Sequence, residues 1–504
     1  MNRKNGLVSV KDAGMLSHVA TFPRYDRDKL RCGIAHMSEG YFHRAHQALF
    51  MHEYLQTHPE PWMTHGIKLL GDDIGIVKRM NAQNNLYTLT ERSGSHDVLK
   101  IIGSIKEVWH AQTDPQRVIN LLAADHIKII SLTVTEKGYS YTPDHHLDVE
   151  DKIIVADLVP KAVPTSAIGY LFSAAKQRME HRGSPLTIMS CDNLPGNGDL
   201  TRSLLLEFAD LKEPAVRRWI EEHISFPNSM VDRITPATTE ETVAFVRNRF
   251  GIDDKCPVIS EAYLQWILED RFINGRPHLE KILVPVQLET KSISAQIQLT
   301  DSVKPYEMLK MRLLNGSHSA LAYVAYLMGH RSVDEAMRDS LLSTFVRQYM
   351  EEVSPTLPEL PSINIPDYKD TLIQRFSNPA TGDQISRLAQ DGSAKLRNFL
   401  IPPLKQQLEM GGPIRHMALV LAAWFRYLRG IDEEGSPIII EDPLRDVLVK
   451  HATMFQDDPE RLLSVDVIFE KGLSANRRLV AEVKQAVDNI NNWGTREALR
   501  RSLE

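Results

Sequence analysis

The chain is poor in several features that would assign it to a class of protein at once. It has three cysteines in 504 residues, Cys32, Cys191 and Cys256, and they are far apart. This odd, sparse set provides no disulfide framework or zinc knuckle and is typical of a reducing cytosol. The longest uninterrupted apolar run, 417–425, is far shorter than the roughly 20 residues of a membrane helix. With no apolar signal segment in the first 30 residues, the sequence predicts a cytoplasmic protein with no membrane partner.

Charge of one sign is also scarce. The formal net charge is -6, and no block of like charges stands out. Nucleic acids and anionic membranes are bound by concentrated basic surfaces, so neither is expected as a partner. The sequence shows no internal repeat and no low-complexity segment. A length of 504 residues exceeds what one hydrophobic core normally supports, which favours two domains.

Up to about residue 300, strand-like runs alternate with helical periodicity. The expected strands are 30–37, 64–70, 86–91, 126–135 and 186–193, and the expected helices between them include 41–55 and 75–83. This alternation predicts a doubly wound α/β sheet, Rossmann-like in type, as a dinucleotide-binding domain over residues 1–300.

After residue 300 the pattern becomes helical. The expected helices are 306–329, 333–352, 371–376, 382–399, 414–428 and 475–490. They predict a mainly α-helical substrate and catalytic domain over residues 301–504. The stretch 282–300 is rich in β-branched residues and is expected near the domain junction.

The first expected strand leads through a short loop into a helix, an order that can hold a pyrophosphate. The loop is Ser38-Glu39-Gly40, followed by Tyr41 and Phe42. It lacks a three-glycine fingerprint, and Glu39 brings a negative charge unless its side chain points away from the phosphates. The pattern alone therefore leaves a plain strand-to-helix turn open.

Two acidic residues, Asp72 and Asp73, follow the second expected strand. An acid at this place can bind the ribose hydroxyls of NAD and repel the additional phosphate of NADP. Their distance from Gly40 exceeds the usual spacing of about 20 residues, and aspartate is common in turns. A nucleotide contact and a structural turn both remain open here.

The expected helix 306–329 carries several polar side chains among apolar neighbours. At about 100° per residue, His318 lies about 80° and Asn315 about 140° around the helix from Lys310. Glu307 is one turn before Lys310, within reach of it. Burying such a set without a purpose is costly, which favours a functional site, while a solvated polar face remains the alternative.

Seven short blocks in a fixed order make the chain recognisable. They are 42–47, 131–139, 189–193, 227–233, 265–270, 310–318 and 375–379. Together they resemble the mannitol dehydrogenase family of polyol-specific long-chain dehydrogenases, over nearly the whole chain. That family includes mannitol 2-dehydrogenases and the fructuronate and tagaturonate reductases.

The resemblance implies an NAD(P)-dependent oxidoreductase that interconverts a polyol and a ketose without a metal. D-mannitol and D-fructose are the favoured pair, and a hexuronate reductase is the alternative within the family. An alternative of another class is a non-catalytic sugar or nucleotide sensor, favoured only by the altered loop at Ser38. The resemblance also implies a monomer, although the sequence itself leaves the oligomeric state open.

The family's catalytic pattern maps onto four residues. Lys310 resembles the general acid/base, and burial is expected to lower its pKa towards working pH. Asn193 and Asn315 resemble the amide pair that stabilises the alkoxide, and His318 resembles the residue that orients the substrate. The expected substrate-binding residues are Asp232, Arg375 and Glu307, the last also linked to proton exchange. The expected cofactor-binding residues are Gly40, Phe42, Asp72, Asp73 and Thr135.

Three departures from the family pattern are visible. Relatives usually have a glycine where this chain has Ser38, which affects the fit of the loop to the pyrophosphate. Lys68, near the end of the second expected strand, weakens the preference for NAD over NADP. The stretch 282–295 is longer than usual and is interpreted as an insertion.

Overall fold

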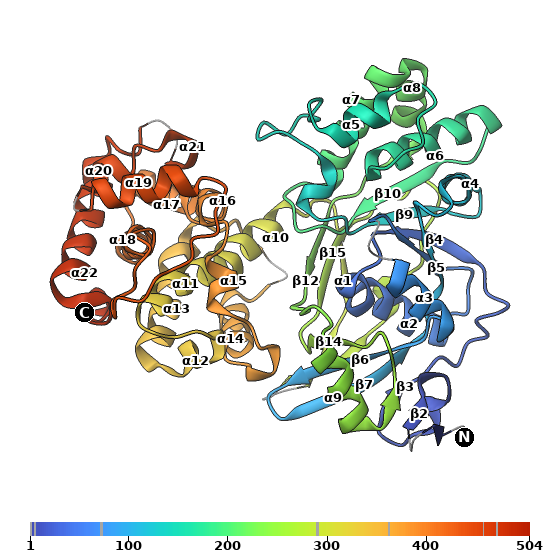
Figure 1. The fold of residues 1–504 in the computed structure, drawn as a ribbon, viewed down its shortest axis with the longest axis horizontal. Coiled ribbons are helices and arrows are strands. Elements are labelled where there is room, and N and C mark those ends of the chain that lie inside the picture. The colour runs from blue at the N-terminus through green and yellow to red at the C-terminus, as the bar shows by residue number, and fades with distance from the viewer. Residues whose placement is uncertain are drawn as a thin grey trace. The chain divides into compact units, whose positions relative to one another are not determined.

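The protein divides into two compact units, Met1–Lys304 and Pro305–Glu504. The computed structural model describes residues 3–4, 7–70, 74–288, 292–360, 363–456, 458–469 and 472–504. Figure 1 shows a first unit of mixed strands and helices and a second unit built from helices.

A parallel sheet forms the centre of the first unit. Its strands are β4 Cys32–Met37, β5 Met63–Lys68, β8 Ile105–His110, β9 Ile129–Leu132, β10 Leu186–Ser190 and β11 Ile224–Ser225. Their order is β11-β10-β9-β4-β5-β8, and every neighbouring pair is parallel. Numbered along the sheet, this is the 3-2-1-4-5-6 order of dinucleotide-binding folds. Every residue of β4, β9 and β10 is buried, as in parallel strands covered on both faces.

The helices that join these strands begin at clear sequence signals. α4 Pro115–Ala123 starts with proline in its first turn, and the Asp114 side chain accepts a hydrogen bond from Arg117 N at 3.0 Å. α6 Ala167–His181 is capped by Ser166, which accepts from Gly169 N at 2.9 Å. Such caps satisfy amides that the helix itself leaves unpaired. The other principal helices are α1 Tyr41–Ala45, α2 Gln47–Thr57, α3 Ile74–Ala82, α5 Lys152–Leu158, α7 Asn197–Lys212, α8 Pro214–His223 and α9 Glu240–Phe250.

The prediction of a single helix over 41–55 is wrong, because the helix is interrupted at His46, between α1 and α2. The backbone of His46 is not helical, at φ -118° and ψ -87°. Its ring nitrogen Nε2 is 2.8 Å from the carbonyl oxygen of Gln265, and its ring packs edge-on against Trp266. A tertiary contact therefore overrides the local helical period.

The expected strand 86–91 exists as β6 Tyr87–Ser93, but it does not belong to the parallel sheet. It pairs with β7 His96–Ile102 as an antiparallel hairpin turning at Gly94, whose φ is 57°. With β3 Val19–Thr21 and β14 Val258–Glu261, these strands form a separate four-stranded sheet. The third strand of the parallel sheet is β8, which periodicity did not reveal.

Three smaller groups of strands complete the first unit. β12 Ser229–Asp232, β15 Gln265–Glu269 and β18 Ile297–Thr300 form one sheet. β1 Arg3–Lys4, β2 Leu7–Ser9 and β13 Ile252–Asp253 form another. The β-rich stretch 282–300 contains β18 and an antiparallel pair, β16 Val284–Gln287 and β17 Ser292–Ala295.

The second unit packs its helices around α18 Arg415–Tyr427, in which every residue of the apolar run 417–425 is buried. The expected helix 333–352 is divided at Asp339, whose side chain caps the second piece at Leu341 N. The expected helix 382–399 is likewise divided, and α17 and α19–α21 were not expected. The helices after α11 Gly316–Leu327 are α12 Val333–Arg338, α13 Ser340–Val353, α14 Ile365–Phe376, α15 Ile385–Ala389, α16 Gly392–Phe399, α17 Ile401–Met410, α18, α19 Arg445–Met454, α20 Pro459–Leu462, α21 Asp466–Phe469 and α22 Arg477–Leu503.

Across the described ranges, no helix combines the length and apolar character needed to cross a membrane.

Candidate active site

Three loops meet at the carboxyl edge of the parallel sheet, following the neighbouring strands β4, β9 and β10. They are residues 38–40, 133–135 and 191–193. The Thr133 hydroxyl donates to the Ser38 carbonyl at 3.1 Å, which joins the first two loops. The strand order reverses between β4 and β9, and open α/β sheets bind ligands at such a switch point. The expected cofactor residues Gly40 and Thr135 thus lie at the same edge as Asn193.

Ser38 has a left-handed backbone, with φ at 66°. This conformation favours glycine and is costly for residues with a Cβ atom. Two hydrogen bonds hold the turn, since Ser38 N and Glu39 N both donate to the Ile67 carbonyl, at 2.8 and 3.1 Å. The departure seen in the sequence therefore falls at a position where glycine would relieve strain.

A buried polar chain supports this loop from inside the sheet. His36 is fully buried, with Nδ1 2.8 Å from Ser131 Oγ and Nε2 2.8 Å from Thr133 Oγ1. Because the Thr133 hydroxyl donates its proton to Ser38, its oxygen accepts from Nε2–H of His36. Burial lowers the pKa of His36 to about 3, so the ring is neutral and can keep these roles.

Glu39 points away from the open side of the loop. Its side chain is fully buried, and Oε1 lies 3.1 Å from Arg44 Nε. Arg44 also donates to the Cys256 carbonyl at 2.7 Å, which fixes the partner in place. A Cβ atom added at Gly40 would meet only the Ser38 carbonyl oxygen, at 3.6 Å. The loop thus has its negative charge paired inside and its backbone accessible to a ligand.

Asp192 ties the 133–135 loop to the end of β10. Its carboxylate accepts from Thr135 N at 2.8 Å, Val134 N at 3.1 Å and the Tyr139 hydroxyl at 2.7 Å. Thr135 needs this support because φ 64° and ψ 166° form a region that β-branched residues avoid. Burial raises the pKa of the Asp192 carboxyl. The next residue, Asn193, is exposed to solvent.

Asp232 ends β12 and is buried. The next residue, Arg233, forms an ion pair with Glu91, with Nη2 2.6 Å from Oε1. Its Nε and Nη2 also donate to the carbonyl of Glu261, so the end of the strand is fixed. Asp72 and Asp73 lie outside the described residues, so the structure does not bear on their expected contact with the ribose.

In the second unit, the expected continuous α-helix over 306–329 is wrong in its most important part. α10 Lys304–Leu309 runs into a π-helical turn, η5 Lys310–Asn315, before α11 begins. In the π-turn the Gly316 amide donates to the Met311 carbonyl, five residues back. The wider turn brings residues five apart, such as Lys310 and Asn315, closer to one face than the α-helical estimate. Single π-turns are rare and occur frequently at functional sites.

Gly316 follows the π-turn and is required by a close neighbour. A Cβ atom there would lie 2.6 Å from the hydroxyl oxygen of Tyr349 on α13. The glycine therefore allows α13 to pack directly against the segment that carries Lys310, which explains a residue otherwise unfavourable within a helix.

His318 on α11 lies beside the end of α14. Its ring is 4.2 Å from that of Phe376, centroid to centroid, and Arg375 directly precedes Phe376. Lys310, Glu307 and Arg375 are all buried. The second unit thus brings together Lys310, Asn315 and His318 on one helical segment, with Arg375 next to the ring that His318 contacts.

The expected residues are divided between the two units. Gly40, Phe42, Thr135, Asn193 and Asp232 belong to the first unit. Glu307, Lys310, Asn315, His318 and Arg375 belong to the second. Within the described ranges, no three His, Cys, Asp or Glu side chains are gathered as a metal site.

Two family descriptions match the chain in succession. The mannitol dehydrogenase Rossmann domain matches residues 32–281, and the mannitol dehydrogenase C-terminal domain matches 302–491. The chain belongs to the mannitol dehydrogenase family. Mannitol 2-dehydrogenase of Neosartorya fischeri is 38% identical over 510 residues, covering 100% of this chain and 99% of that protein. Mannitol dehydrogenase 2 of Saccharomyces cerevisiae is 37% identical, covering 96% and 94%.

Solved structures of the mannitol dehydrogenase type agree with this membership. Mannitol 2-dehydrogenase of Pseudomonas fluorescens, in a ternary complex with NAD and D-mannitol, is 38% identical with a TM-score of 0.83, covering 96% of this chain and 97% of that one. A substrate-free D-sorbitol dehydrogenase is 32% identical with a TM-score of 0.88, covering 98% and 100%. The resemblance and the fold class expected from the sequence are both confirmed.

The antiparallel pair of β16 and β17 lies in the β-rich stretch that the sequence indicated, and it falls between the two matched family regions, in residues 282–301. Two residues that support the site were not found from the sequence. The supporting residues His36 and Asp192 were not singled out, although Asp192 stands beside Asn193 within a recognised block. Adjacency to an expected catalytic residue was the available signal for Asp192, and no comparable signal marks His36.

Proposed function

We propose that this chain is an NAD-dependent polyol dehydrogenase that interconverts a polyol and a 2-ketose, with D-mannitol and D-fructose as the favoured pair. The observation that carries the proposal is similarity along the whole chain to mannitol 2-dehydrogenases, one of them solved with NAD and D-mannitol. Residues 1–300 bind the dinucleotide, and residues 301–504 provide the proton chemistry. The proposed enzyme is a cytoplasmic monomer.

The carboxyl edge of the parallel sheet fits the cofactor. The open space beside Gly40, the inward-turned Glu39 and the left-handed Ser38 leave room for a diphosphate at the switch point. Phe42 and Thr135 lie at the same edge, and Asp72 and Asp73 are the proposed ribose contacts. When bound, the nicotinamide accepts or returns the hydride, which is chemistry that the protein itself cannot supply.

The proposed proton chemistry depends on Lys310. In polyol oxidation its amine takes the proton of the reacting hydroxyl, and in ketose reduction it returns that proton. The amides of Asn193 and Asn315 donate hydrogen bonds to the oxygen as negative charge develops on it, which stabilises the alkoxide without a metal. His318 orients the same oxygen.

The remaining expected residues serve binding and proton exchange. Asp232 and Arg375 bind substrate hydroxyls, because a carboxylate accepts and a guanidinium donates hydrogen bonds. Glu307, one turn before Lys310, exchanges protons between the lysine and solvent. Both Glu307 and Lys310 are buried, so a relay is more useful there than at an exposed lysine.

D-sorbitol is the second candidate substrate, because the D-sorbitol dehydrogenase has the higher TM-score of the two structures. D-mannitol and D-sorbitol differ in configuration at C2, and oxidation there converts both to D-fructose. A hexuronate reductase would require a cation for the substrate carboxylate, and a sensor would bind nucleotide without turnover.

The test measures NADH and NADPH consumption with fructose, fructuronate and tagaturonate, and NAD reduction with D-mannitol and D-sorbitol. We expect turnover with fructose and NADH, and a loss of at least a hundredfold in kcat for Lys310→Ala with NADH binding unchanged. Turnover unaffected by Lys310→Ala contradicts the mechanism. Nucleotide binding with no turnover of any sugar favours the sensor.

A further inference from the structure

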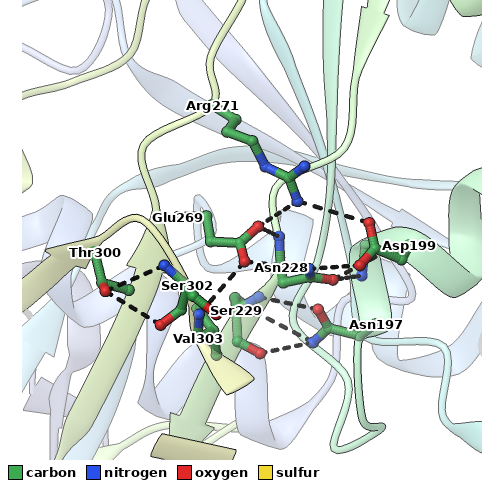
Figure 2. A network of polar contacts seen from close by, with 10 residues as sticks. Asn197, Asp199, Asn228, Ser229, Glu269, Arg271, Thr300, Ser302 and Val303 are labelled. Carbon is green, nitrogen blue, oxygen red and sulfur yellow. Dashed lines mark hydrogen bonds and ion pairs between the residues drawn. The ribbon is translucent and has the colours of Figure 1, made fainter. Parts of the chain in front are cut away.

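Asn197, the first residue of α7, uses every polar atom of its side chain while fully buried. Its Oδ1 accepts from Ser229 N at 3.0 Å, and its Nδ2 donates to the Ser229 carbonyl at 2.8 Å. The same Nδ2 donates to the Asp192 carbonyl at 2.9 Å. Figure 2 shows the paired contact of Asn197 with Ser229.

The two backbones that Asn197 joins lead directly to two expected site residues. Asp192 precedes Asn193, the expected alkoxide-stabilising amide, and Ser229 begins the strand β12 that ends at Asp232. The Ser229 hydroxyl reinforces the link, because it donates to the Ser190 carbonyl at 2.6 Å. Asn197 therefore sets the separation between the end of β10 and the beginning of β12.

We propose that Asn197 is a positioning residue that holds Asn193 in register with the substrate-binding end of β12. This inference rests on the proposed function for its kinetic consequence, although the link itself is a matter of structure. A catalytic amide displaced by about 1 Å loses much of its effect on the transition state. Asn193 is exposed. Asn197, four residues later, is buried and makes the three hydrogen bonds to the backbones of Ser229 and Asp192.

The start of α7 is held firmly enough for such a role. Asn228 Oδ1 accepts from Gly198 N at 2.9 Å and Asp199 N at 3.0 Å, which caps the helix (Figure 2). Asn228 N in turn donates to Glu269 Oε2 at 3.0 Å. A Cβ atom added at Gly198 would lie 2.5 Å from the Pro227 carbonyl oxygen, so the helix approaches this segment as closely as glycine permits.

The chemistry requires an amide at position 197. Aspartate has the same shape, but it cannot donate to the carbonyls of Asp192 and Ser229. Its carboxylate would face both oxygens in a buried site, where unpaired polar groups and like partial charges are costly. We therefore expect Asn197→Asp to push the Asp192–Asn193 turn away from β12 without changing the volume of the side chain.

The experiment compares Asn197→Asp with Asn81→Asp, a control that has the same hydrogen-bonding pattern at an exposed residue. Asn81 makes the same two-way contact with one backbone, donating to the Val108 carbonyl at 2.9 Å and accepting from Val108 N at 3.3 Å. For Asn197→Asp we expect kcat to fall at least tenfold, NADH affinity to stay within twofold, and the isotope effect on kcat with 4-deuterated NADH to rise. For Asn81→Asp we expect a lower Tm with kcat and the isotope effect unchanged.

Ser229→Ala provides a milder test that survives if Asn197→Asp does not fold. It removes the hydroxyl that donates to the Ser190 carbonyl at 2.6 Å and accepts from Asn197 Nδ2 at 3.4 Å. We expect kcat to fall about threefold with the same rise in the isotope effect. Normal kcat in Ser229→Ala and in folded Asn197→Asp overturns the inference. If the wild-type protein turns over no sugar, the proposed function fails. In that case, crystal structures of the wild type and Asn197→Asp test whether Asn197 positions Asn193. A displaced Asn193 in the variant supports the inference, and an unmoved Asn193 overturns it.

Discussion

At the scale of single residues, two loops of the candidate site each hold a strained backbone conformation. Ser38 and Thr135 both have positive φ, and they lie on the two loops that flank the switch point of the sheet. Residues held in such regions cost about 1–3 kcal/mol and persist where the surroundings determine them. Here the surroundings are visible, because His36 and Thr133 support Ser38, and Asp192 holds Thr135.

We expect Ser38→Gly to stabilise the protein by about 1 kcal/mol, because glycine adopts φ near 66° without a Cβ clash. Urea unfolding measures the change in free energy, and titration with NADH tests whether the loop keeps its affinity. Ser140→Gly is the matched control, since Ser140 is also left-handed, at φ 49°. A loss of stability in Ser38→Gly alone would show that the serine side chain outweighs the strain.

The sequence could identify the chemistry at this scale but not its orientation. Lys310, Asn193 and Asn315 were expected from their place in recognised blocks, and their roles remain predictions. Glu39 illustrates what was beyond reach, because its partner Arg44 is held in place by the carbonyl of Cys256, far away in the sequence. Whether a charge faces a ligand or the core is decided by tertiary packing, which a local pattern does not contain.

At the scale of elements, periodicity located segments well and failed where another element intervened. The parallel strands β4, β9 and β10 fall within expected strands, and β5 begins one residue before the expected strand 64–70. The helix expected over 41–55 broke because His46 binds a distant carbonyl. The helix expected over 306–329 widened into a π-turn at Lys310–Asn315, and α-helical apolar spacing gives no sign of that extra residue per turn.

The packing of α13 against the π-turn gives the second prediction. We expect Gly316→Ala to destabilise the protein by about 2 kcal/mol, because the added methyl group meets the Tyr349 hydroxyl oxygen at 2.6 Å. Tyr349→Phe removes that oxygen and should be nearly neutral, since no hydrogen-bond partner for it is found among the described residues. A double-mutant cycle read by chemical unfolding should show that Tyr349→Phe recovers at least half of the loss. Additive effects would contradict the contact.

At the scale of the whole molecule, buried neutral histidines make stability depend on pH. Burial, with the positive charge of Lys68, lowers the pKa of His36 to about 3. Burial, with Lys100 and Arg27, lowers the pKa of His52 to about 3 as well. In the unfolded chain both titrate near the ordinary value of 6.5. The unfolded state therefore binds protons first as the pH falls, and stability present above pH 6.5 is lost from there down to about 3.

We expect the free energy of unfolding to fall by roughly 2 kcal/mol for each of these histidines between pH 7.5 and pH 5. Urea unfolding at both pH values measures the fall. His52→Gln removes one titrating group and should reduce the difference by about that amount, whatever its effect at pH 7.5. A variant with the same pH dependence as the wild type would show that His52 does not contribute.

The pairing of β2 with β13 has a consequence for how this protein is made. Val8 pairs with Ile252, so the segment that contains Val8 meets this neighbour only after about half of the chain has followed it from the ribosome. At about 5–20 residues per second, that interval is on the order of ten seconds or more. The strands of the parallel sheet emerge earlier and can associate first. The small sheet at the N-terminus then closes late in translation, and until then its edge is a place where nascent chains can pair with one another.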